Sequence, residues 1–73
     1  MGHTVSAELV ASVLSISVTP GQRVSVGDEL LLLDSMKMEI PVLAEVAGIV
    51  TDVVVKAGDT VRDGDPLVVI QRG

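Results

Sequence analysis

The order of hydrophobic and polar residues along this 73-residue chain predicts short β-strands separated by turns. Residues 13–18 alternate between apolar and polar side chains after their first pair, and residues 49–55 are rich in β-branched side chains. Residues 30–33 and 67–70 are continuous apolar runs of strand length. We therefore expect an all-β protein.

The chain repeats itself with an offset of 37 residues. The pattern Val-x-x-Gly-x-x-Val-x-x-Gly-Asp-x-Leu starts at Val18 and again at Val55, with six identities in thirteen positions. The offset is half the chain length, so the sequence predicts two related halves of one fold, at about residues 11–35 and 48–72. A solenoid is not expected, because solenoids need at least about three stacked units.

Glycine-containing turns punctuate both halves, since glycine readily adopts positive φ. They are marked by Pro20-Gly21, Gly27-Asp28, Ala57-Gly58-Asp59 and Gly64-Asp65. Between the turns of each half, Val24 or Val61 inserts one apolar side chain into the core. Pro41 and Pro66 are expected at strand starts or on edge strands, where a missing backbone donor is tolerated. Short strands with such turns are typical of a small sandwich or barrel.

Residues 29–40 conflict with this interpretation when they are taken alone. They consist largely of strong helix formers and contain neither glycine nor proline, so they favour a helix. The repeat favours a strand instead, because the counterpart at residues 66–71 is rich in valine and isoleucine. We expect a strand over residues 30–33, with Leu32 and its counterpart Val69 buried in the core.

The same argument places a hairpin turn at Met36-Lys37-Met38. Lys37 is the central residue of the chain, with 36 residues on either side. A pseudo-two-fold axis relating the halves would put this turn at one end of the molecule and both termini at the other.

Composition and charge exclude several classes of function. The chain has no cysteine, so it has no disulfide framework, thiolate nucleophile or Cys-ligated metal site. Its net charge of −5 and its lack of aromatic residues argue against a nucleic-acid binder. No apolar run exceeds four residues, far short of the roughly 18 that a membrane span needs. Without a secretion signal, the cytoplasm is the expected location.

A metal site is not expected. Asp59, Asp63 and Asp65 cluster in sequence but do not match a calcium-binding loop. We interpret them as turn carboxylates that accept hydrogen bonds from nearby backbone N–H groups. His3 is expected to be a solvated residue in a frayed end.

At the central turn, the chain resembles the biotinyl/lipoyl attachment domain family. The similar residues are Asp34-Ser35-Met36-Lys37-Met38-Glu39-Ile40-Pro41-Val42, followed by Ala44, Gly48 and Val50. The resemblance covers about residues 5–71 of a single domain, 1–73, and is greatest to the small stand-alone biotinylated carrier proteins. It implies a flattened eight-strand barrel, in which two four-stranded sheets pack as a sandwich with the modified lysine at the central hairpin turn.

The resemblance also implies a function. The ε-amine of Lys37 would carry covalent biotin, and Met36 and Met38 would form the flanking recognition motif. A biotin protein ligase would attach the biotin and supply the base, because a lysine side chain is almost wholly protonated at neutral pH. The loaded arm would shuttle a carboxyl group from a biotin carboxylase to a carboxyltransferase. The chain would be a carrier rather than an enzyme, and we expect it to be a monomer.

Two alternatives remain open. The chain could be a lipoyl carrier for acyl transfer, although lipoyl domains usually place an acidic residue just before the lysine and a small residue after it. Here methionine stands on both sides of Lys37, and Ser35 replaces the alanine of most biotin domains. The chain could instead be an unmodified protein-binding module, but such a module has no reason to keep a lysine between two methionines.

Overall fold

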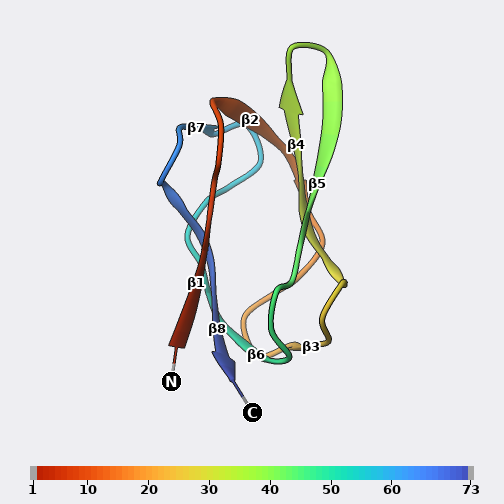
Figure 1. Ribbon diagram of the computed structural model, residues 1–73, viewed down its shortest axis with the longest axis vertical. Coiled ribbons are helices and arrows are strands. Elements are labelled where there is room, and N and C mark those ends of the chain that lie inside the picture. The colour runs from red at the N-terminus through yellow and green to blue at the C-terminus, as the bar shows by residue number, and fades with distance from the viewer. Residues whose placement is uncertain (1, 73) are drawn as a thin grey trace.

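Eight β-strands form two four-stranded sheets in the computed structural model of the chain, which describes residues 2–72 (Figure 1). The strands are β1 (Gly2–Ser6), β2 (Ala11–Ile16), β3 (Arg23–Val24), β4 (Glu29–Ser35), β5 (Met38–Leu43), β6 (Gly48–Val53), β7 (Thr60–Val61) and β8 (Pro66–Arg72). One sheet has the order β1-β8-β6-β3 and the other β5-β4-β2-β7, and all the strand pairs are antiparallel. The predicted all-β sandwich of two four-stranded sheets is confirmed. Within residues 2–72, no strand pairing joins the sheets into a closed barrel.

The structure repeats with the same offset as the sequence. The bounds of β6, β7 and β8 are those of β2, β3 and β4 shifted by 37 residues. Each sheet takes its two inner strands from one half of the chain and its two outer strands from the other. Residues 37 positions apart therefore occupy equivalent places, which gives each position in one half an internal reference in the other.

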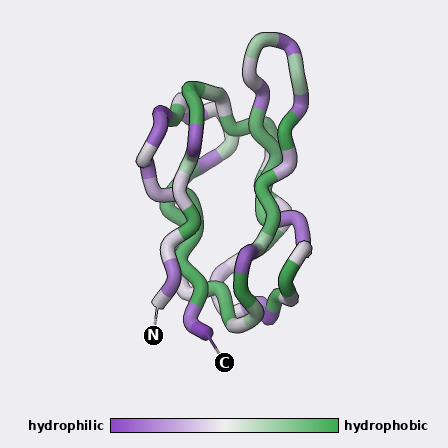
Figure 2. The backbone as a smooth tube through the Cα atoms, in the orientation of Figure 1, coloured by the Kyte–Doolittle hydropathy of each residue, from purple (hydrophilic) through white to green (hydrophobic). Residues whose placement is uncertain are grey.

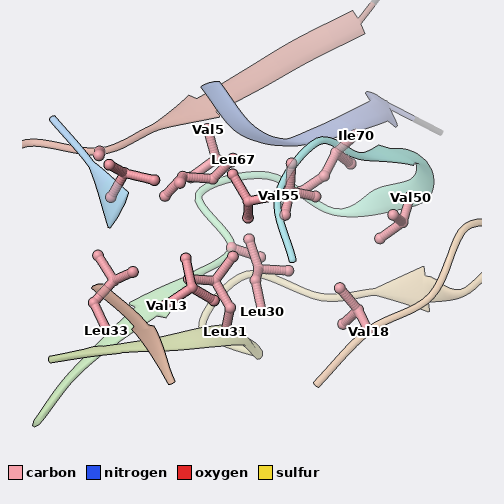
Figure 3. Packing of buried hydrophobic residues seen from close by; sticks show 14 of the residues in the cluster. Val5, Val13, Val18, Leu30, Leu31, Leu33, Val50, Val55, Leu67 and Ile70 are labelled. Atoms are coloured by element: carbon pink, nitrogen blue, oxygen red, sulfur yellow. The ribbon is translucent and has the colours of Figure 1, made fainter. Parts of the chain in front are cut away.

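The core between the sheets consists of aliphatic side chains. Figure 3 shows Leu31 and Leu33 of one sheet pointing toward Leu67 and Val5 of the other. Val24 and Val61 are both buried, as predicted. Figure 2 shows hydrophobic residues following the strands and hydrophilic ones gathering at the turns. Within the described residues no polar or charged side chain is buried, so the core contains no group that needs an internal hydrogen-bond partner.

A β-bulge changes which side chains the apolar runs bury. The pairing of β4 with β5 shifts between Glu29 and Leu31, so Leu30 and Leu31 both face the core despite being neighbours. Alternation then turns Leu32 outward, where it is only half-buried. The equivalent shift beside β8 leaves Val69 half-buried as well. The prediction that Leu32 and Val69 are core residues is therefore wrong.

Four turns share one construction, with glycine at positive φ in the third position. The glycines are Gly21, Gly27, Gly58 and Gly64, with φ between 91° and 96°. In three of the turns the following aspartate accepts a hydrogen bond from the first residue's backbone N–H. The bond is 2.8 Å from Ser25 to Asp28, 2.9 Å from Lys56 to Asp59 and 2.9 Å from Arg62 to Asp65.

The predicted role of two carboxylates is therefore confirmed, namely those of Asp59 and Asp65. Asp63 is exposed and makes no such bond to any residue in the range 2–72.

Local predictions near the strand ends can also be checked. Pro66 begins β8, and Pro41 lies within β5, an edge strand, as predicted. The helix favoured by composition over residues 29–40 is replaced by a strand, a turn and a second strand. The prediction of a frayed end at His3 is wrong, because His3 pairs with Ile70 inside β1. In the described part of the chain, no helix is long and apolar enough to cross a membrane.

Candidate functional site: the lysine hairpin

Strands β4 and β5 are joined by a two-residue turn formed by Met36 and Lys37. Ser35 pairs with Met38 across its base, and the two turn residues have φ values of 53° and 66°. Positive φ at both central residues is typical of a type I′ hairpin turn, whose twist matches that of the flanking strands. The predicted turn is confirmed at residues 36 and 37, and Met38 is the first residue of β5.

The two turn residues are of types that rarely adopt the positive φ that this turn requires. Met36 and Lys37 are the only non-glycine residues with positive φ among residues 2–72. The left-handed conformation costs an ordinary L-residue roughly 1 kcal/mol, and type I′ turns strongly prefer Asn-Gly or Asp-Gly. Folding alone would therefore not select a methionine and a lysine here.

All three side chains of the Met-Lys-Met segment are exposed to solvent. Met36 is 93% exposed and Met38 is 62% exposed. Among residues 2–72, the one basic side chain within 4.0 Å of a carboxylate oxygen is His3, beside Glu45, so no carboxylate of that range holds the Nζ of Lys37. The turn lies at the end of the molecule opposite the start of β1 and the end of β8, as predicted (Figure 1). Lys37 thus offers an unhindered primary amine.

A hydrogen bond at the base of the hairpin was not foreseen from the sequence. The Oγ of Ser35 donates to the backbone carbonyl of Val10, at 3.0 Å. This bond ties the hairpin to the loop between β1 and β2, beside a shallow hollow lined by Val10, Met36 and Thr60. The sequence contains no local signal for it, since the two residues are 25 positions apart.

A groove of about 310 Å³ runs between the edge strands β1 and β5. Leu9, Leu33 and Ile40 line its apolar part. The place equivalent to Ile40 is held by His3, whose Nε2 lies 3.0 Å from Glu45 Oε1 and links β1 to the loop after β5. Ile40 has no polar side-chain atom, so it cannot form an equivalent link across the groove.

Among the described residues, Lys37 is the one candidate for holding a cofactor, and it would do so through a covalent bond to Nζ. Within residues 2–72, no three side chains of the histidine, aspartate and glutamate types come together as metal ligands would. In the same range, no carboxylate oxygen that could serve as a base lies within 4.0 Å of Nζ of Lys37. The arrangement can present an amine, and later whatever is attached to it, to another protein.

The geometry agrees with the comparisons to known proteins. A family model described as "Biotin-requiring enzyme" matches residues 2–70. The chain is 56% identical over 70 residues to a Mycobacterium leprae protein named "Biotinylated protein TB7.3 homolog", covering 96% of this chain and 99% of that protein.

Two solved structures show the same fold. A single-chain, multi-domain long-chain acyl-CoA carboxylase matches with a TM-score of 0.91 and 30% identity, over 99% of this chain and 7% of that one. The lipoyl domain of the 2-oxoglutarate dehydrogenase complex from Azotobacter vinelandii matches with a TM-score of 0.82 and 25% identity, over 96% of each chain. The chain belongs to the biotinyl/lipoyl attachment family.

Proposed function

We propose that this protein is a biotin carrier whose prosthetic group is attached to Nζ of Lys37. The observation that carries the proposal is the turn itself. A lysine and a methionine occupy left-handed positions at a solvent-exposed tip, where folding favours asparagine and glycine. The relationship to a protein named as biotinylated supports biotin as the attached group.

Attachment forms an amide between Nζ of Lys37 and the carboxyl carbon of biotin, while the bond from that carbon to the phosphate of biotinyl-adenylate breaks and AMP leaves. The amine must lose a proton before it can attack, and no carboxylate of residues 2–72 lies within 4.0 Å of it to serve as a base. A biotin protein ligase is therefore the proposed source of both the activated carboxyl group and the base. The amide removes one positive charge, which changes the formal net charge from −5 to −6.

Met36 and Met38 are the proposed recognition residues. Their side chains are long, flexible and polarisable, which suits contact with more than one protein surface. Their exposure contributes nothing to the core. Turn and flanking residues thus form a small adaptable surface around the modified amine.

When attached, biotin supplies a ureido nitrogen that accepts a carboxyl group at one active site and releases it at another. The proposed partners are a biotin carboxylase and a carboxyltransferase in the cytoplasm, in line with the fold match to an acyl-CoA carboxylase. The role of this chain is to hold the arm at the tip of a rigid sandwich. Tethering raises the effective concentration of the group at each active site, typically to millimolar, without any new contact.

The test is the intact mass of the protein after co-expression with a biotin ligase, with peptide mapping across residues 36–38. We expect the added mass of biotin less one water on Lys37, and none on a Lys37→Arg variant, which folds but has no usable amine nucleophile. Labelling of the arginine variant would contradict the site. A lipoyl group on Lys37 would make the protein an acyl carrier, and a folded but unmodified wild type would make it a binding module.

A further inference from the structure

Exposed apolar side chains are distributed unequally between the two sheets. Among residues 2–72, three of the seven large ones lie in strands of the sheet β5-β4-β2-β7, and none lies in a strand of the other sheet. The three are Leu14, Met38 and Leu43, whereas Val10, Val26, Met36 and Val54 lie in loops and turns. Since both sheets share the same framework, this excess is not needed for folding.

Part of the excess lies on the outside of the sheet that carries Lys37. Leu32 of β4 points away from the core and lies opposite Ser15 of β2 and Pro41 of β5. Leu14, the extra residue of a bulge beside Ser15, is 43% exposed, and Leu43, two residues beyond Pro41, is 46% exposed. Leu14, Leu32, Pro41 and Leu43 form what we name the outer apolar face.

The equivalent positions on the other sheet are mostly polar. Thr51 replaces Leu14 and donates a hydrogen bond from its Oγ1 to the Val69 carbonyl, at 3.2 Å. Thr4 replaces Pro41 and pairs with Val69 as Pro41 pairs with Leu32. Ser6 replaces Leu43. The framework is therefore compatible with hydroxyl side chains at three of the four positions.

Two carboxylates separate the outer apolar face from the lysine turn. Asp34 and Glu39 lie directly opposite each other on neighbouring strands. Asp34 comes two residues after Leu32, and Glu39 two residues before Pro41. Both carboxylates therefore lie on the same side of the sheet as the outer apolar face. Like charges placed directly opposite are destabilising. The equivalent pair on the other sheet is Gln71 opposite Gly2, which is neutral. An acidic pair that opposes folding calls for a cationic partner.

We propose that the outer apolar face and the acidic pair together dock the enzyme that loads the carboxyl group onto the arm. This inference rests on the proposed function of Lys37. An enzyme that binds ATP and bicarbonate needs a cationic active-site entrance, which complements Asp34 and Glu39 at the edge nearest the lysine. The outer apolar face lies on β2, β4 and β5, and β4 and β5 also form the lysine hairpin. A protein that receives the tip of the hairpin can therefore contact this face as well.

A second copy of this chain fits the surface poorly. A stable interface buries about 800 Å² per partner, close to a fifth of the 4414 Å² surface of this chain, and four side chains cannot cover that area. Two copies would also bring their acidic pairs together in molecules of net charge −5. The face suits a transient contact with a different, basic protein.

The test uses fully biotinylated carrier, verified by intact mass, and a purified biotin carboxylase from the organism that makes it. The variant Leu14→Thr/Leu43→Ser installs the residues that the other half holds at the same places. We expect the KM for the carrier to rise about tenfold with kcat unchanged. Val54→Ser, which copies Ser17, removes a 51% exposed apolar side chain elsewhere and should leave KM unchanged.

The charge component has its own variant, Asp34→Asn/Glu39→Gln. We expect its KM to rise several-fold at low salt and to approach the wild-type value at high salt, because screening weakens the same contacts. An unchanged KM for both variants would overturn the docking proposal. So would a rise in KM confined to the carboxyltransferase, or a loss of biotinylation in folded variants, which would assign the surface to the ligase. Absence of biotin from the wild type would instead overturn the proposed function as well.

Discussion

Leu30 and Leu67 occupy equivalent positions in the two halves of the protein, as do Leu14 and Thr51, but only the first pair is alike. Leu30 and Leu67 are both fully buried between the sheets. Leu14 and Thr51 are both bulge residues on the outside, one apolar and one hydroxylated. Interior positions hold similar residues because they pack in the same way in both halves, whereas exterior positions hold residues of different polarity. The differences therefore mark what the protein does beyond folding.

The largest effect is expected in the shared interior. Leu30→Asp and Leu67→Asp each bury an unpaired carboxylate, which costs several kcal/mol and is comparable with the whole stability of a small domain. We expect both variants to be unfolded by circular dichroism at 25 °C, to a similar extent. Leu32→Asp, on the outer side of the same strand, should remain folded. A folded Leu67→Asp beside an unfolded Leu30→Asp would show that the interiors are not equivalent.

A smaller loss of stability is expected at a position where one half has glycine and the other has alanine. Gly48 is the counterpart of the buried Ala11, and a Cβ at Gly48 would overlap the backbone carbonyl of Gln71. Gly48→Ala should lower the free energy of unfolding by about 2–3 kcal/mol, because backbone must move to admit the methyl group. Urea unfolding measures the loss. A change below about 1 kcal/mol would mean that β6 and β8 separate easily at this point.

At the lysine turn, by contrast, substitution should increase the stability of the protein. Met36→Asn/Lys37→Gly replaces two strained residues with the pair that type I′ turns prefer, and should raise the free energy of unfolding by about 1–2 kcal/mol. The same variant should take up no biotin. Thermal unfolding and intact mass measure the two effects. A variant no more stable than the wild type would show that the turn is not strained.

The smallest effect is expected at the turn that departs from the common construction. Gln22 stands where the other three turns have aspartate, and its amide oxygen accepts from the N–H of Thr19 at 3.3 Å, against 2.9 Å for Lys56 and Asp59. Gln22→Asp should stabilise the protein by about 0.5–1 kcal/mol through a shorter, charge-assisted bond. Asp59→Gln is the matched reverse change and should destabilise it. Equal urea midpoints for all three proteins would contradict this.

The internal repeat made much of the fold predictable. Local propensity over residues 29–40 favours a helix, and only the valine-rich counterpart at residues 66–71 indicates a strand. The position of Lys37 at a turn follows from the same symmetry. Local propensity alone would have given the wrong structure for the segment that carries the site.

Features that depend on register or on distant partners could not be predicted. A bulge shifts alternation by one residue, so nothing in a run of four leucines shows that Leu32 is the one that turns outward. The contact between His3 and Glu45 joins residues 42 positions apart, and that between Ser35 and Val10 joins residues 25 apart. The outer apolar face became visible only when strand pairing placed Leu32 opposite Pro41.

The placement of both chain ends opposite the lysine has a mechanical consequence. The molecule measures 35 Å along its longest axis and 18 Å across, with β1 beginning and β8 ending at one extremity. A polypeptide joined at either end would hold the domain by its base and leave Lys37 at the far tip. If the domain rotates about that base, the amine of Lys37 moves along an arc whose radius is about the length of the domain. The length of the rigid sandwich thus adds to the reach of the flexible lysine side chain.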